Sequence, residues 1–198
     1  MTTFLLLRHA AHENVGAFLA GRAAGIVLED AGMAQARRLG ERLRREAIAA
    51  LYCSPRERAR QTAGIVAELC GTPAPRVMEA LDEIDFGVWS GRTFEALSED
   101  AEWRAWNARR SLAGTPNGER MIDVQARVLA AMEQMALGAR DATLALVTHA
   151  DVIKAALMYH LGLHLDDWWR LEVGPASISR LVVDGHGARL IGLNELVD

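Results

Sequence analysis

Three short apolar runs constrain the fold of this chain more than any other feature. They cover residues 3–7, 48–53 and 143–148, are rich in Leu, Val, Ile or Ala, and show no strict alternation with polar residues. Such runs are typical of strands buried on both faces, as in a parallel sheet covered by helices. The sequence therefore predicts a mostly parallel central sheet.

The stretches between these runs have apolar residues at a helical period of about 3.6. They predict helices over residues 31–46, 58–70, 119–137 and 151–161. Strands that alternate with helices favour α/β units with right-handed crossovers. Residues 177–183 and 188–193 are expected to form a closing hairpin. We expect a single domain over residues 1–198, a three-layer α/β/α sandwich with a helical and loop excursion at about 92–118.

Composition excludes several classes of protein. The 198 residues carry a net charge of −4, whereas a non-specific nucleic-acid or membrane-surface binder would show a basic excess. With 51% hydrophobic and 24% charged residues, the chain can bury a core and is unlike a disordered segment. No nucleic-acid or membrane partner is therefore expected.

The sequence also predicts a cytoplasmic location. No apolar run approaches the length of a membrane span, and Arg8 ends the first run too early for a signal peptide. Cys53 and Cys70 are too few for a disulfide framework and lack metal-ligand spacing. We expect two reduced thiols.

Polar residues follow each of the three predicted strands. Arg8 and His9 end the first run, Ser54 and then Arg58 follow the second, and His149 follows the third. The carboxyl ends of parallel strands meet at one edge of a sheet, where ligands bind in open α/β folds. Helix N-termini at the same edge favour an anion. Arginines and histidines gathered there predict a phosphate pocket.

Such a pocket could carry out catalysis as well as binding. A neutral imidazole can attack phosphorus as a nucleophile, provided that its second ring nitrogen holds the proton. The leaving oxygen needs a proton, for which Asp82, Glu83 and Asp85 are candidate donors. A Gly-rich phosphate loop with a terminal Lys-Ser/Thr is missing, which argues against a nucleotide kinase or GTPase, and no acidic cluster has Mg²⁺ spacing.

Four ordered segments carry a more specific signal. They are Arg8-His9-Ala10, residues 54–63, residues 81–91 and residues 147–150. Together they resemble the motifs of the histidine phosphatase superfamily, the phosphoglycerate mutase-like proteins. Ordered motifs that span positions 8 to 150 are far more specific than any one of them.

The resemblance implies a role for each matching residue. His9 would be the nucleophile that becomes phosphohistidine, and Glu83 would protonate the leaving oxygen and then help water attack. Arg8, Arg58 and His149 would hold the phosphoryl oxygens and stabilise charge in the transition state. No metal or organic cofactor is implied.

The chain departs from the family pattern at a few positions. Ala10 and Ala150 stand where the family usually has Gly, and one methyl group is tolerated unless the backbone needs a positive φ. A phosphate contact that the family makes with an asparagine is lost here, shifted to Asn14, or taken over by His12. His12 has the alternative of being an exposed loop histidine.

These observations predict a phosphatase that hydrolyses a small phosphorylated substrate. The segment between Glu83 and His149 looks short for a true mutase. The alternatives are a phosphoglycerate mutase-type phosphotransferase and a weakly active phosphate-binding regulatory protein. The oligomeric state stays open, with a homodimer as one option.

Overall fold

The computed structural model describes residues 1–12 and 16–197, and within them six strands form one sheet in the order β3-β2-β4-β1-β5-β6. The strands are β1 (Thr2–Arg8), β2 (Ile48–Cys53), β3 (Arg76–Val77), β4 (Thr143–Thr148), β5 (Ile178–Asp184) and β6 (Gly187–Glu195). The first four pair in parallel, whereas β5 and β6 form an antiparallel hairpin beside β1. The mostly parallel sheet and the hairpin are thus confirmed.

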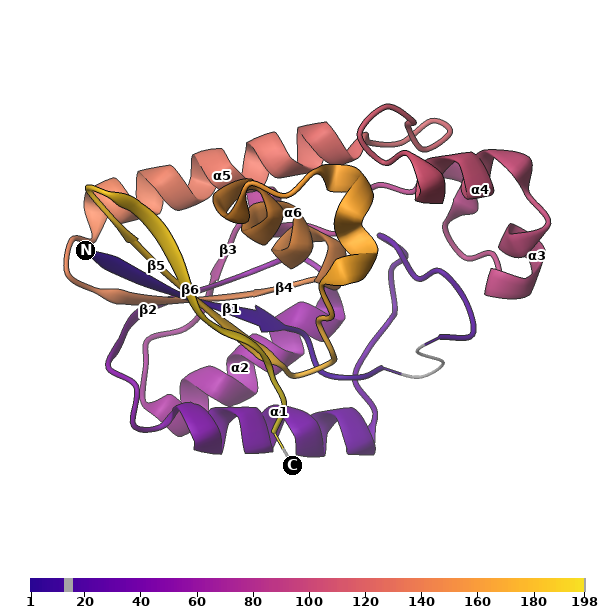
Figure 1. Cartoon of the computed structure of the whole chain (residues 1–198). Helices are drawn as coiled ribbons and strands as arrows, with labels where there is room; N and C mark the ends of the chain where they lie inside the picture. The colour runs from indigo at the N-terminus through magenta and orange to yellow at the C-terminus, as the bar shows by residue number, and fades with distance from the viewer. Residues whose placement is uncertain (13–15, 198) are drawn as a thin grey trace.

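Helices cover both faces of this sheet (Figure 1). One face carries α1 (Asp30–Leu43) and α2 (Glu57–Cys70), and the other carries α5 (Met121–Gly138) and α6 (Ala150–Leu161). Within β1, Leu5 and Leu7 pack with the first pair of helices, while Phe4 and Leu6 pack with the second. Burial on both faces explains why the strand shows no polar alternation, and the three-layer α/β/α arrangement is confirmed.

The predicted excursion consists of two short helices, α3 (Phe94–Ser98) and α4 (Ala101–Ala108), followed by a loop. Each helix begins at a capping side chain: Thr93 accepts from the N–H of Ala96 at 3.2 Å, and Asp100 accepts from that of Glu102 at 3.0 Å. Among the residues described, 3₁₀ helices that no sequence pattern predicted span Glu79–Leu81, Gly87–Trp89 and Leu165–Arg170.

The first helix ends earlier than predicted. The pattern extended it to residue 46, but α1 stops at Leu43 and the N–H of Arg44 turns to the carbonyl of Glu41. The chain has to reverse between Leu43 and the start of β2 at Ile48, and that short connection takes up the last predicted helical turn.

Cys53 and Cys70 are both free thiols in this fold, the first buried and the second half-buried. Within residues 1–12 and 16–197, no helix combines the length and the apolar character that crossing a membrane requires.

Candidate active site

Two histidines meet at the carboxyl ends of neighbouring strands. β1 and β4 pair in parallel with Arg8 opposite Thr148, so His9 and His149 follow the two strands at the same level. The N–H of His9 donates to the carbonyl of Thr148 at 2.9 Å, and the ring centroids of the two histidines lie 5.1 Å apart. The predicted convergence is therefore observed.

The ring of His9 is oriented by its own backbone. Its Nδ1 lies 2.8 Å from the carbonyl oxygen of Ala10, so this nitrogen carries the proton and donates it. Its Nε2 accepts from the Nε of Arg58 at 3.3 Å. Burial, together with the positive charges of Arg58 and Arg8, holds the pKa of His9 well below its ordinary value. The imidazole is thus neutral, with the Nε2 lone pair facing Arg58.

Two arginines offer donors at this point. Arg58 is buried at the start of α2, where its Nη2 donates to the carbonyl of Gly21 at 2.8 Å. Arg8 is anchored by a 2.7 Å hydrogen bond from its Nη1 to the carbonyl of Val173. The Nη1 of Arg58 and the Nε of Arg8 are buried without an acceptor among the described residues. Buried N–H donors that lack a protein acceptor beside a histidine can bind the oxygens of an anion.

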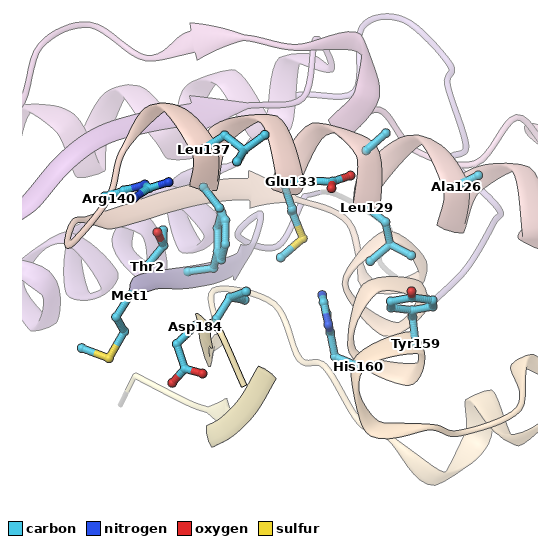
Figure 2. Close-up of a pocket in the computed structure, with 16 residues that line it drawn as sticks. Met1, Thr2, Ala126, Leu129, Glu133, Leu137, Arg140, Tyr159, His160 and Asp184 are labelled. Atoms are coloured by element: carbon cyan, nitrogen blue, oxygen red, sulfur yellow. The ribbon is translucent and has the colours of Figure 1, made fainter. Parts of the chain in front are cut away.

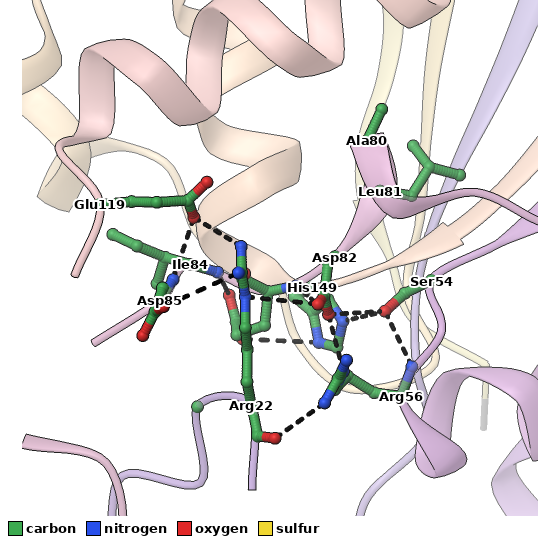
Figure 3. A network of polar contacts seen from close by, with 12 residues as sticks. Arg22, Ser54, Arg56, Ala80, Leu81, Asp82, Ile84, Asp85, Glu119 and His149 are labelled. Carbon is green, nitrogen blue, oxygen red and sulfur yellow. Dashed lines mark hydrogen bonds and ion pairs between the residues drawn. The ribbon is translucent and has the colours of Figure 1, made fainter. Parts of the chain in front are cut away.

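The ring of His149 is held from behind by Ser54. The Nε2 of His149 lies 2.7 Å from Ser54 Oγ, which in turn donates to Asp82 at 3.3 Å (Figure 3). Because the serine hydroxyl gives its proton to a carboxylate, it accepts from the Nε2 of His149. The Nδ1 of His149 then faces the Nη2 of Arg58 at 3.3 Å. Sequence analysis gave Ser54 no role, although it placed this residue after a strand at the same edge.

Of the three candidate carboxylates, Glu83 faces the histidines. Its Oε2 lies 3.4 Å from the Nδ1 of His149 and 3.9 Å from the Nη2 of Arg58. Asp82 instead pairs with Arg56 at 2.9 Å and accepts from the N–H of Glu83 at 2.7 Å. Asp85 accepts from the N–H of Gly87 at 2.9 Å, which stabilises a turn.

Burial and the negative charge of Asp151 raise the pKa of Glu83 to about 7, although Arg58 opposes the shift. At neutral pH this carboxyl group is therefore divided between its protonated and charged forms. A group of this kind can both give and take a proton in one catalytic cycle.

Arg8, His9, Arg58 and Glu83 line a cavity of about 270 Å³. His149 contacts two of them, Arg58 and Glu83. His12 also lines the cavity, with its ring centroid 5.7 Å from that of His9, and it is half-buried rather than exposed as the loop interpretation had it. Asn14, the other predicted substrate contact, lies outside the described residues. Backbone hydrogen bonds between residues 17–19 and 91–94 build one wall, to which Phe18 and Phe94 contribute side chains.

The two alanines that replace the usual glycines are tolerated by the backbone. Residues with positive φ other than glycine in the described part of the chain are Asn117, Asp141, Ala176 and Asn194. Ala10 and Ala150 therefore keep an ordinary conformation that accommodates a Cβ atom.

A larger cavity, of about 820 Å³, lies elsewhere (Figure 2). It is lined by Met1, Leu129, Tyr159, His160 and Asp184, among others, at the opposite end of the strands. None of the converging histidines and arginines reaches it. Across the described chain, no three His, Cys, Asp or Glu side chains are grouped so as to hold a metal ion.

The fold and this site define an α/β enzyme that handles phosphate beside a buried histidine. A model of the histidine phosphatase superfamily (branch 1) matches residues 4–196, and the chain belongs to that superfamily.

Named relatives agree with this assignment. Phosphoserine phosphatase 1 of Hydrogenobacter thermophilus is 28% identical over 199 residues, which cover 98% of this chain and 92% of the relative. The protein named "Probable phosphoglycerate mutase GpmB" of Photorhabdus laumondii is 31% identical over 192 residues, covering 91% and 85% of the two chains. The solved structure of YhfR from Bacillus stearothermophilus superposes with a TM-score of 0.89 at 31% identity, covering 99% and 98%.

Proposed function

We propose that this chain hydrolyses small phosphate monoesters through a phosphohistidine formed on His9. One observation carries the proposal: the unprotonated Nε2 of a neutral His9 and the carboxyl group of Glu83 both face Arg58. A nucleophile, a proton donor and charge-stabilising groups thereby surround a single phosphoryl position.

In the first step, the Nε2 of His9 attacks phosphorus, and the bond between phosphorus and the ester oxygen breaks. Glu83 gives its proton to that leaving oxygen, so an alcohol departs rather than an alkoxide. Arg8 and Arg58 hold the phosphoryl oxygens with their N–H groups and stabilise the charge that develops on them. His149 joins them when its Nδ1 takes a proton, which the negative charge of a bound phosphate favours. His12 and Asn14 are proposed as further contacts to the substrate.

In the second step, water attacks the phosphohistidine. Glu83, now a carboxylate, takes a proton from that water, and the bond between nitrogen and phosphorus breaks to release phosphate. His9 and Glu83 return to their starting forms, and the cycle needs no redox change.

The two alternatives differ in measurable ways. A phosphoglycerate mutase would pass the phosphoryl group to a second hydroxyl group of phosphoglycerate. The similarity to the protein named GpmB is the reason for considering this reaction. A regulatory phosphate-binding protein would show no turnover. Catalysis is favoured over binding alone because the nucleophile, the acid and the charged groups converge. Hydrolysis is favoured over the mutase reaction because the segment between Glu83 and His149 is short for a true mutase.

A screen of phosphorylated metabolites tests this function directly. We expect phosphate release from at least one small monoester, with phosphoserine and 3-phosphoglycerate in the panel, and the same rate when EDTA is present. Loss of turnover with EDTA would contradict the metal-free mechanism. Isomerisation of phosphoglycerate without phosphate release would favour the mutase alternative.

The pH profile of kcat/KM is expected to fall above about pH 7, because Glu83 then loses the proton that it donates. Because the pKa of His9 lies well below its ordinary value of 6.5, His9 is neutral near pH 6.5. Its protonation therefore causes no fall in kcat/KM at that pH. The measurement compares wild type with Glu83→Gln, because dividing the two profiles removes the ionisation of the substrate itself. A ratio that stayed constant through pH 7 would contradict the role of Glu83.

We further propose a cytoplasmic location, supported by the free thiols of Cys53 and Cys70. Light scattering of the purified protein distinguishes a monomer from the homodimer that the sequence left open.

A further inference from the structure

The loop that carries Glu83 is held by charged side chains that the proposed reaction does not use. The Nε of Arg22 donates to the backbone carbonyl of Glu83 at 2.7 Å, and the Nη2 of Arg127 donates to the same oxygen at 3.2 Å. Arg127 also donates through Nη1 to the carbonyl of Ala80 at 2.8 Å. Two guanidinium groups from distant parts of the chain therefore fix one short loop.

Glu119 joins these two guanidinium groups. Its Oε2 accepts from the Nη2 of Arg22 at 2.7 Å, and its Oε1 accepts from the Nε of Arg127 at 3.1 Å. The same Oε2 accepts from the N–H of Asp85 at 3.0 Å, as the contacts drawn in Figure 3 show. Two like charges that share one carbonyl oxygen repel each other, and the carboxylate between them offsets this repulsion.

The backbone of Glu119 is fixed against the same loop. Its N–H donates to the carbonyl of Asp85 at 2.9 Å, and Thr115 Oγ1 donates to that carbonyl at 2.8 Å. A Cβ atom on Gly118 would clash with the carbonyl oxygen of Asp85, and one on Gly87 would clash with that of Pro116. The two backbones are thus in direct contact, which leaves Glu119 little freedom to move.

We propose that Glu119 is a positioning residue for Glu83. By holding Arg22 and Arg127 together on the carbonyl of Glu83, it keeps the Glu83 carboxyl group beside His149 and the leaving oxygen. Glu119 itself is absent from the described residues that line the catalytic cavity, so it acts through the loop. This inference rests on the proposed function of Glu83 as a proton donor.

Two phosphate esters of similar size distinguish a loss of proton donation from a loss of overall catalytic activity. Benzyl phosphate releases a strongly basic alkoxide that needs a proton, whereas 4-nitrophenyl phosphate releases a stable anion that does not. We expect Glu119→Gln to lower the benzyl to 4-nitrophenyl ratio of kcat/KM about tenfold or more, in the same direction as Glu83→Gln. The matched control is Glu133→Gln, an exposed glutamate of α5, which leaves the ratio unchanged.

Inhibition by inorganic phosphate shows whether the rest of the site is intact, since Arg8 and Arg58 would bind that anion. If Glu119→Gln lowered kcat/KM equally for both esters, or for neither, the positioning role would be overturned. If Glu119→Gln does not fold, Arg127→Lys tests the same link, because one ammonium group cannot bridge Glu119 and two loop carbonyls. Wild-type protein that hydrolyses neither these esters nor any metabolite would instead contradict the proposed function.

Discussion

Replacing His9 with alanine is expected to lower the rate of phosphate release by a factor of roughly 10⁴–10⁶, because the nucleophile is lost. The Nε2 of His9 is the ring nitrogen that faces Arg58, whereas the Nε2 of the neighbouring His149 is occupied by Ser54. The measurement is steady-state hydrolysis, together with trapping of the phosphorylated protein. We expect label that survives alkali and is lost in acid, as a phosphoramidate requires.

His186→Gln is the matched control, because this histidine is exposed in the turn between β5 and β6. It should keep wild-type turnover and labelling. Activity that persists in His9→Ala, or label found on another residue, would remove His9 as the nucleophile. A circular dichroism spectrum equal to that of wild type would show that the loss is chemical.

Replacing Glu83 with glutamine is expected to lower kcat/KM for benzyl phosphate by about 10²–10⁴, the usual contribution of a general acid. The loss for 4-nitrophenyl phosphate should be less than about tenfold, since its leaving group departs without a proton. Glutamine keeps the size of the side chain and removes both the proton that Glu83 donates and the base that it becomes in the second step. The value of kcat/KM reports the first of these, because it covers the steps up to release of the leaving group. Parallel measurement of kcat/KM for the two esters checks the expectation.

The exposed glutamate at position 102 on α4 offers a comparison, because Glu102→Gln makes the same chemical change away from the cavity. It should leave both esters unaffected. If Glu83→Gln reduced the two values equally, its carboxyl group would be serving some purpose other than protonating the leaving oxygen.

The central strands could be predicted from the sequence because burial on both faces leaves a continuous apolar run. This holds for β1 and β4, whereas β2 has the same apolar composition although only Leu51 and Cys53 are buried. By contrast, the two residues of β3, Arg76 and Val77, are both exposed, so no pattern marks them as a strand. Parallel pairing of the buried runs then brought His9 and His149 to one edge.

Residue spacing alone could not show which of the three carboxylates is the proton donor. Asp82, Glu83 and Asp85 lie in an irregular loop, where the direction of each side chain depends on partners far along the chain. Those partners include Arg22 and Glu119, which come from separate loops. No local pattern indicates that they meet, and only the resemblance to a known family pointed to Glu83.

The wall built from residues 17–19 and 91–94 has a consequence for how this enzyme could change its substrate. The N–H of Leu19 donates to the carbonyl of Arg92 at 2.9 Å, and that of Phe94 donates to the carbonyl of Ala17 at 3.2 Å. Main-chain bonds of this kind do not depend on which side chains the residues carry. Phe18 and Phe94 can therefore be exchanged for other residues while the path of the chain persists, which makes them the natural targets for directed evolution of a new leaving-group preference.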